Sequence, residues 1–170
     1  MSWFRFLAGA VAVCAAAGLS GCFQPLYGEA AHPTLVADLR AIEVSPIANR
    51  VGHYLADNLV TELNGTGETP SAKYKLTVTV ALGTQTPTVN SELNVATSAT
   101  VTGEATYTLT KVDGGAEVVK GKAQAAASYD RTAQRYADLR AARDAELRIA
   151  RALASEISVR LASALAEKSS

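Results

Sequence analysis

The sequence is poor in the residues that build reactive sites. It holds two cysteines, two histidines, one methionine and one tryptophan among 170 residues, and only 6% of its residues are aromatic. Lysine plus arginine equals aspartate plus glutamate at 16 each, so no net charge attracts the chain to nucleic acid or to a cationic partner. Any electrostatic recognition must be local. With 48% hydrophobic and 19% charged residues, the composition remains ordinary for one soluble domain.

A hydrophobic run long enough to span a membrane is also missing. Residues 6–19 (FLAGAVAVCAAAGL) are apolar and follow a short segment with one positive charge. As a helix they reach about 21 Å, at roughly 1.5 Å per residue. Because the hydrocarbon core of a bilayer is about 30 Å thick, this run predicts the apolar region of a signal peptide and not a transmembrane anchor.

The apolar run ends in a motif typical of bacterial lipoproteins, formed by Leu19, Ser20, Gly21 and Cys22. The two small residues fit the narrow cleft of the lipoprotein signal peptidase, and Cys22 supplies the thiol that receives a diacylglycerol. The alternative is a secretory signal with an incidental cysteine. Cleavage before Cys22 removes Cys14 as well, so the mature chain is expected to have no free thiol and no disulfide.

Lipidation of Cys22 would attach the chain to a membrane by its first mature residue. Each buried acyl CH₂ adds about 0.8 kcal/mol, and stable anchoring takes at least two signals, which triacylation supplies. Phe23 stands where aspartate commonly marks inner-membrane retention, which favours the outer membrane. We therefore divide the chain into a signal peptide (1–21), a lipidated N-terminus and tether (22–36) and a single α+β domain (37–168).

The first half of the domain changes between two periodicities. Residues 39–47 alternate apolar and polar and predict a first strand. A helix is expected next, with Asn49 as its N-cap and with Asn64 and Gly65 at its end. Its apolar residues recur every four positions: Val51, Leu55, Leu59 and Leu63. Residues 74–82 then alternate strictly and predict the second strand.

The second half begins with two more predicted strands, residues 95–109 and 118–129, joined by a turn at residues 113–115. Each strand has one apolar face, so the sheet needs a cover on that side. A helix over residues 133–168 provides it. The predicted fold is α+β, with two helices packed on one face of a roughly four-stranded mixed sheet, in the order β-α-β-β-β-α.

At about 100° per residue, the last helix should present one apolar stripe. The stripe consists of Tyr136, Leu139, Ala142, Ala150, Leu153, Ala154, Ile157, Leu161 and Ala164, with Leu147 and Leu165 at its margin. Two i,i+4 ion pairs are expected on this helix, between residues 144 and 148 and between residues 156 and 160. Arg143 and Glu146 fall inside the stripe. They should pair with each other, bind a partner outside the domain, or remain exposed to solvent where the helix extends beyond the sheet.

Motifs for catalysis or metal binding are not found. There is no G-x-S-x-G around a serine, and the glycine-rich segment GTGETPSAK lacks the spacing of a phosphate-binding loop. His53 lies on the first helix away from its apolar stripe and has no second ligand at a suitable spacing, so a surface role is expected. We therefore predict no enzyme activity, no metal and no cofactor beyond the lipid on Cys22.

The face of the sheet opposite the helices is predicted to carry lysines among threonines: Lys75, Lys111, Lys120 and Lys122. Their ammonium groups could meet phosphates as point charges, with Lys120 and Lys122 as candidate contacts to a phosphorylated lipid. Lysine on strands also protects sheets from edge-to-edge aggregation, which is the alternative reading.

Several segments together resemble LptE, the lipopolysaccharide-assembly lipoprotein family, in its alphaproteobacterial form. They are LSGCFQPLYG at 19–28, NRVGHYLADNLVTEL at 49–63, YKLTVTVAL at 74–82, ATYTL at 105–109 and YADLRAARDAELRIARALASEISVRL at 136–161. The most specific are FQPLYG directly after Cys22 and the run from Tyr136 to Glu146. The resemblance covers nearly the whole mature chain, although no catalytic motif defines the family.

The resemblance implies two helices on a mixed sheet and a place inside the large outer-membrane β-barrel LptD. Proteins of this family plug that barrel, assist its assembly and help to deliver lipopolysaccharide to the outer leaflet. A polar sheet face suits the polar lumen of a barrel. Two alternatives are an accessory lipoprotein of an ABC-type lipid-trafficking system in the periplasm and a periplasmic hydrolase.

Overall fold

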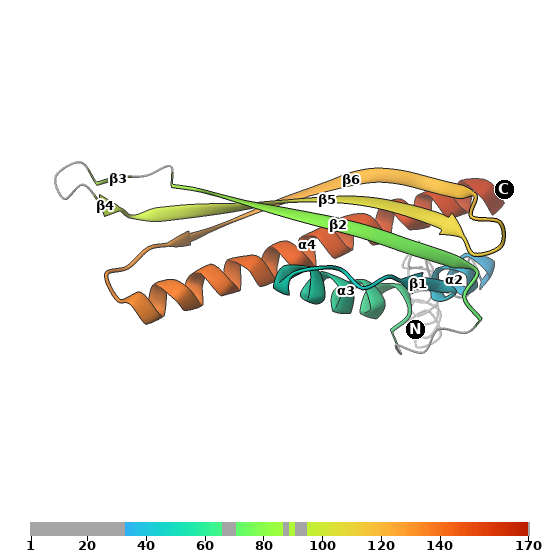
Figure 1. The fold of residues 1–170 in the computed structure, drawn as a ribbon, viewed down its shortest axis with the longest axis horizontal. Coiled ribbons are helices and arrows are strands. Elements are labelled where there is room, and N and C mark those ends of the chain that lie inside the picture. Colours follow the sequence, from blue (N-terminus) through green and yellow to red (C-terminus); the bar gives the residue numbers. More distant parts are fainter. Residues whose placement is uncertain (1–32, 66–70, 87–88, 91–94, 170) are drawn as a thin grey trace, which may run out of the picture. The chain divides into compact units, whose positions relative to one another are not determined.

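The computed structural model describes residues 33–65, 71–86, 89–90 and 95–169. Apart from a short helix, α2 (Pro33–Arg40), every element described lies within one compact unit, Ala37–Ser170. This unit is a two-layer α+β fold with a mixed sheet on one side and two helices on the other (Figure 1). The predicted fold class is therefore confirmed.

The sheet has four strands in the order β1-β2-β5-β6. They are β1 (Ile42–Val44), β2 (Tyr74–Gln85), β5 (Ser98–Lys111) and β6 (Glu117–Asp130). β1 runs parallel to β2, and the other neighbours are antiparallel, which makes the sheet mixed. A separate two-stranded hairpin is formed by β3 (Val89–Asn90) and β4 (Val95–Ala96). The turn between β5 and β6 uses Gly114 and Gly115 at φ values of 82° and 66°, as the Asp-Gly-Gly sequence predicts.

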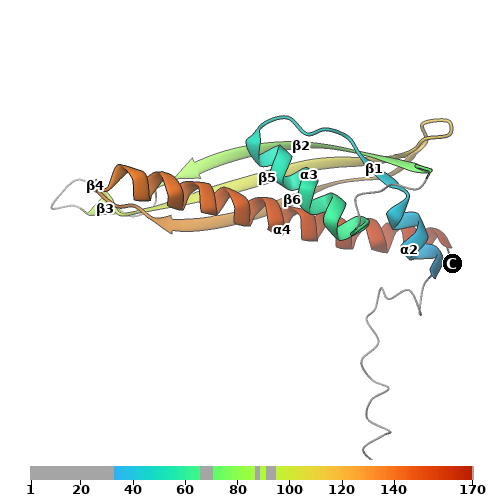
Figure 2. The ribbon, with the colours of Figure 1, turned by 90° about the horizontal axis from the view of Figure 1, so that it is seen from below.

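The helix layer consists of α3 (Arg50–Leu63) and α4 (Arg135–Ser169). α3 is the crossover between the parallel strands β1 and β2, and α4 follows β6 and runs back along the sheet (Figure 2). α3 ends as expected, with Asn64 at the C-cap and Gly65 at a φ of 70°. Its N-cap differs from expectation because the Asn49 side chain makes no capping hydrogen bond.

The core lies between the layers and follows the strict alternation of the strands. Leu76 and Leu109 of the sheet, Leu55 and Leu59 of α3 and Leu153 of α4 are all fully buried. Burying one such side chain stabilises the fold by about 1.5 to 3 kcal/mol. Alternate residues of β2, β5 and β6 thus point into this core, as their period of two predicts.

Small residues under α4 let the helix approach the sheet closely. β5 and β6 direct mainly alanine and glycine toward the helix, whereas β2 directs leucine and valine. A Cβ on Gly103 would lie 2.5 Å from Cγ2 of Ile149 and 3.3 Å from Cδ1 of Leu153. Gly121 is covered by the ring of its cross-strand partner Tyr107, which is 2% exposed. The layer spacing over β5 therefore depends on glycine.

The N-terminal part of the domain differs from the sequence-based expectation. Residues 39–47 do not form one strand: α2 extends to Arg40, and β1 covers only Ile42–Val44. Pro33 starts α2, since its fixed φ suits the first turn of a helix. β2 in turn continues beyond the expected end at residue 82, to Gln85.

The predicted apolar stripe of α4 is correct from Ala150 to Leu161 and wrong toward the start of the helix. Leu153, Ile157 and Leu161 are fully buried. Tyr136 and Leu139, by contrast, are 75% and 47% exposed. Toward the N-terminal end of α4 the buried residues are Ala145 and Ile149, both fully buried. Neither residue belongs to the predicted stripe.

We predict that Gly103→Ala destabilises the domain by about 1 to 3 kcal/mol, the usual cost of overpacking a core. The added methyl group would meet Ile149, so α4 must move away from β5. Urea unfolding followed by circular dichroism measures the change. Ala126→Ser is the matched control, because Ala126 is exposed on the opposite face of the neighbouring strand. An unchanged midpoint for Gly103→Ala would show that the layers are not in tight contact there.

Candidate functional site

The candidate site is the face of the sheet that no described helix covers, called here the open face. Its residues alternate with the buried ones along β2, β5 and β6 and are rich in threonine, with lysines at positions 75, 120 and 122. Of the large hydrophobic side chains exposed in the described part of the chain, none lies on this face. The open face is therefore polar along three long strands.

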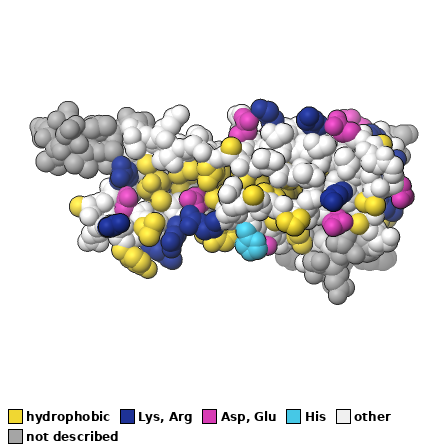
Figure 3. All heavy atoms as spheres, in the orientation of Figure 1, with side chains coloured by type: hydrophobic (Ala, Val, Ile, Leu, Met, Phe, Trp, Pro, Cys, Tyr) yellow, Lys and Arg dark blue, Asp and Glu magenta, His cyan; other side chains and the backbone are white. Residues whose placement is uncertain are grey.

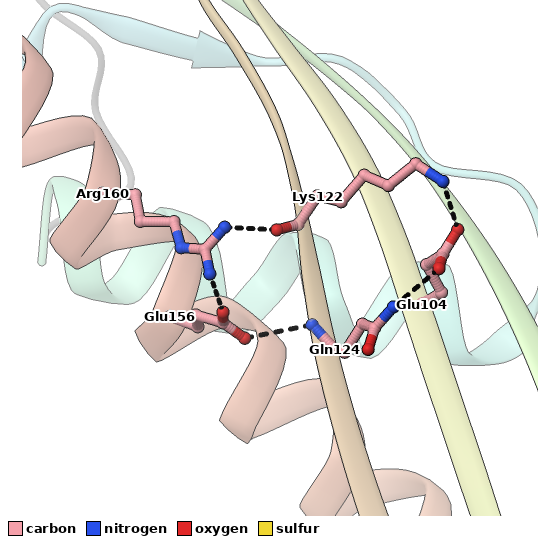
Figure 4. Close-up of polar contacts among 5 residues, drawn as sticks. All are labelled: Glu104, Lys122, Gln124, Glu156 and Arg160. Carbon is pink, nitrogen blue, oxygen red and sulfur yellow. Dashed lines mark hydrogen bonds and ion pairs between the residues drawn. The ribbon is translucent and has the colours of Figure 1, made fainter.

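Two lysines of the predicted phosphate site differ in their surroundings. Lys122 Nζ lies 2.9 Å from Oε1 of Glu104 on the adjacent strand, and Gln124 Nε2 donates to Oε2 of the same carboxylate at 2.9 Å (Figure 4). Hydrogen bonds from Lys122 and Gln124 lower the pKa of Glu104 below its ordinary value of 4.5. Lys120 makes no ion pair within the described residues, so its ammonium group is the more available one.

A shallow depression of about 520 Å³ lies across β2, β5 and β6. Its lining on the open face is built from small or polar residues, including Ala81, Gly83, Thr102 and Ala126, with Glu104 and Gln124 beside them. Hydroxyl groups on this face already bond across strands, as Thr100 Oγ1 and Ser128 Oγ do at 2.8 Å. The surface can thus accept a hydrogen-bonding partner, and its depression is lined mainly by alanine and glycine.

The outer edge of β6 is closed by side chains of α4. Arg148 Nη2 donates to the carbonyl of Ser128 at 2.9 Å, and Lys168 Nζ donates to the carbonyl of Val118 at 3.0 Å. Between them, Glu156 accepts from the backbone N–H of Gln124 at 3.1 Å. Arg160 donates to the carbonyl of Lys122 and also pairs with Glu156 (Figure 4). We call these four α4 side chains the edge clamp.

The spacing of the edge clamp follows from helix and strand geometry. From residue 148 to residue 160 the helix rises about 18 Å, at roughly 1.5 Å per residue. From residue 128 to residue 122 the strand covers about 20 Å, at roughly 3.3 Å per residue. Four residues of helix therefore match two residues of strand. Both i,i+4 pairs expected on this helix are present, Arg148 with Asp144 at 2.9 Å and Arg160 with Glu156.

Arg143 and Glu146, which stood out in the sequence, are not paired with each other. Glu146 instead forms an ion pair at 2.5 Å with Arg50, the first residue of α3. This pair holds the pKa of the Arg50 guanidinium above its ordinary value. Arg143 is exposed and makes no ion pair within the described residues. The expectation failed for Glu146 because only the tertiary fold brings α3 beside α4.

The other residues that the sequence singled out, Cys22 and His53, form no site in the described structure. Cys22 and the predicted signal peptide lie outside the described residues. His53 is an exposed histidine on α3, with Nε2 3.6 Å from Asp57 Oδ2. No cluster of three or more His, Cys, Asp or Glu side chains that could hold a metal occurs in the ranges that the structure describes. No helix described here is long and apolar enough to cross a membrane.

Fold and site together define a helix-backed mixed sheet with one polar, uncovered face. The sequence matches no protein family model and no curated protein. Solved structures do match. A candidate lipoprotein from Caulobacter crescentus CB15 aligns with a TM-score of 0.64 and 28% identity, covering 82% of this chain and 98% of that one.

A second solved structure has the same fold at lower identity. It is a minor lipoprotein from Acinetobacter baumannii, with a TM-score of 0.53 and 13% identity, covering 72% of this chain and 90% of that one. Rare lipoprotein B from Shewanella oneidensis aligns at a TM-score of 0.45 and 14% identity over 75% of this chain and 95% of that one, which is too distant to support an argument. The chain is thus similar in structure to bacterial lipoproteins.

The edge clamp generates a prediction. Arg160→Ala should destabilise the domain by about 1 to 2 kcal/mol, because the carbonyl of Lys122 loses a charged donor and Glu156 loses its cation. It should also promote self-association through the freed edge of β6. Urea unfolding and light scattering measure the two effects. Arg151→Ala is the matched control, since Arg151 is exposed on the same helix. Equal behaviour of both variants would contradict the clamp.

Proposed function

We propose that this chain is an LptE-type outer-membrane lipoprotein that plugs an LptD-type β-barrel, assists its assembly and serves lipopolysaccharide transport to the cell surface. The observation that carries the proposal is the polar open face, which runs along three long strands while the helices cover the other face. Such a face suits the polar interior of a barrel, where a leucine-rich surface would not.

The lipoprotein part of the proposal has two supports. The chain ends its apolar leader with Leu19-Ser20-Gly21-Cys22. It also aligns with almost the whole length of a candidate lipoprotein from Caulobacter crescentus at 28% identity. A lipid on Cys22 would keep the domain at a membrane surface, and the sorting rule for Phe23 favours the outer membrane. In this proposal the protein acts by binding and has no enzymatic step.

The first experiment tests lipidation and partner together. Cys22→Ser should leave the chain without acyl groups, so it should move from the membrane fraction to the soluble fraction. The unaltered protein, purified in mild detergent, should carry an outer-membrane β-barrel with it, and loss of the protein should deplete surface lipopolysaccharide. Mass spectrometry of the mature N-terminus checks acylation directly. Association with an inner-membrane transporter alone would replace the barrel proposal by the ABC-type accessory role.

The second experiment tests the lysines of the open face. Lys120→Ala should weaken binding of purified lipopolysaccharide about two- to fivefold, the effect of one screened ion pair of about 0.4 to 1 kcal/mol. Lys122→Ala should have a smaller effect, because Lys122 already pairs with Glu104. Fluorescently labelled lipopolysaccharide gives the dissociation constants. Arg151→Ala, on the helix layer, is the control. Equal affinity of all variants for lipopolysaccharide would mean that the lysines instead protect the sheet from edge-to-edge aggregation.

A further inference from the structure

We propose that a groove beside β2 binds an extended, acidic segment of a partner protein, which adds a strand to the sheet. The groove consists of two adjoining cavities, which are lined by Val80 and Leu82 of β2, by residues 49–54 at the start of α3 and by residues 140–147 of α4. The inference rests on the proposed function only in naming the β-barrel as the source of that segment. Strand addition is a recognised way in which an exposed sheet edge binds a peptide.

The first argument is the free edge of β2. β1 pairs only with residues 74–76, whereas β2 pairs with β5 as far as Gln85. The carbonyl of Leu76 accepts from Ser45 N at 2.9 Å on the β1 side. Because backbone groups alternate in direction along a strand, Val78, Val80, Leu82 and Thr84 point their N–H and C=O groups to the same side.

No backbone hydrogen bond from the described residues reaches these four positions on that side. The other edge of the sheet, on β6, is closed by the edge clamp. Val78 and Val80 are buried, whereas Leu82 and Thr84 are exposed, so the accessible part of this edge is residues 81–86. Exposed backbone donors and acceptors are a template for another strand. The sheet therefore has one protected edge and one that can be extended.

The second argument is the apolar floor beside that edge. Leu82 of β2 is 42% exposed and Leu147 of α4 is 36% exposed, and each lines one of the two cavities. α3 begins only at Arg50 and leaves this part of the helix layer incomplete. A cavity of about 300 Å³ opens here, lined by Val51, Val80 and Leu82 among others. Figure 3 shows hydrophobic side chains exposed in the same half of the molecule, with basic side chains gathered next to them.

A strand added to β2 would direct alternate side chains toward this floor. Its other side chains would continue the polar open face, where β2 presents Thr77, Thr79 and Ala81. The occupant is therefore an extended segment with alternating apolar and polar residues. A lipid lacks the backbone groups that the free edge requires.

The third argument is charge. A second cavity of about 380 Å³ adjoins the first at Arg50 and is lined by Arg140, Arg143 and Asp144 as well. Asp144 already pairs with Arg148 and Arg50 with Glu146, while Arg140 and Arg143 make no ion pair within the described residues. The groove thus favours acidic residues in its occupant. A second copy of this chain would bring another arginine cluster to the same place, which argues against a homodimer.

The test places a photo-reactive phenylalanine derivative at position 82 of the full-length lipidated protein in its own cells. Mass spectrometry of the cross-linked peptide should identify an acidic, extended segment of the β-barrel partner. The control position is Val112, which is 51% exposed in the β5–β6 turn and should not capture that segment. Adducts only with lipid or with a second copy of this chain, or no adduct, would overturn the inference.

Two matched pairs of variants test the interactions. Thr84→Pro removes an N–H that points to the free edge and should reduce the adduct about tenfold, whereas Thr84→Val keeps the N–H and should not. Arg143→Glu should also reduce the adduct, and Arg151→Glu, outside the groove, should not. Circular dichroism confirms folding of each variant. If Thr84→Pro is folded and its adduct is unchanged, strand addition is wrong.

The outcomes separate this inference from the proposed function. If the barrel co-purifies with the unaltered protein but position 82 captures no segment of it, the groove inference fails and the barrel proposal stands. If position 82 captures an acidic segment of a different envelope protein, and Thr84→Pro abolishes that adduct, the groove inference stands and the barrel proposal fails.

Discussion

The packing of α4 against β5 and β6 is the contact on which the rest of the domain depends. It works because β5 and β6 present alanine and glycine to the helix, which lets Ile149 and Leu153 lie almost on the backbone of Gly103. That closeness also brings the long polar side chains of α4 within reach of the β6 backbone. The close contact of α4 with β5 and β6 thus forms part of the core and also protects the edge of β6.

The unequal lengths of the two helices shape the surface. α4 has 35 residues and α3 has 14, and β1 has only 3 residues against 12 in β2. The two short elements, α3 and β1, therefore leave the outer edge of β2 without a described neighbour at its far end, and Leu82 and Leu147 remain partly exposed in the cavities there. An isolated domain gains nothing from such exposure, since apolar surface left in water contributes no hydrophobic stabilisation. A partner that covers this side would complete both layers at once.

The two faces of the sheet have different roles: the covered face stabilises the fold, and the open face is the proposed binding surface. The covered face supplies the hydrophobic stabilisation, and the open face keeps threonine hydroxyls and lysine ammonium groups available for hydrogen bonds. A face of this kind can lie against another protein or against water with little change in free energy, because its polar groups exchange one hydrogen-bonding partner for another. This property suits a protein that works inside a wet assembly, as proposed here.

The sequence by itself determined the alternation of the three long strands, the turn at Gly114 and Gly115, the end of α3 and the fold class, since these follow from local periodicity and backbone preference. Only the tertiary structure decided which end of α4 is buried, that Glu146 pairs with Arg50, and that α4 closes the β6 edge while β1 pairs with only the start of β2. Those features join residues as far as 96 positions apart. Periodicity reports which side of an element is apolar, and it carries no information about which neighbour comes to cover that side or how far along the element the cover extends.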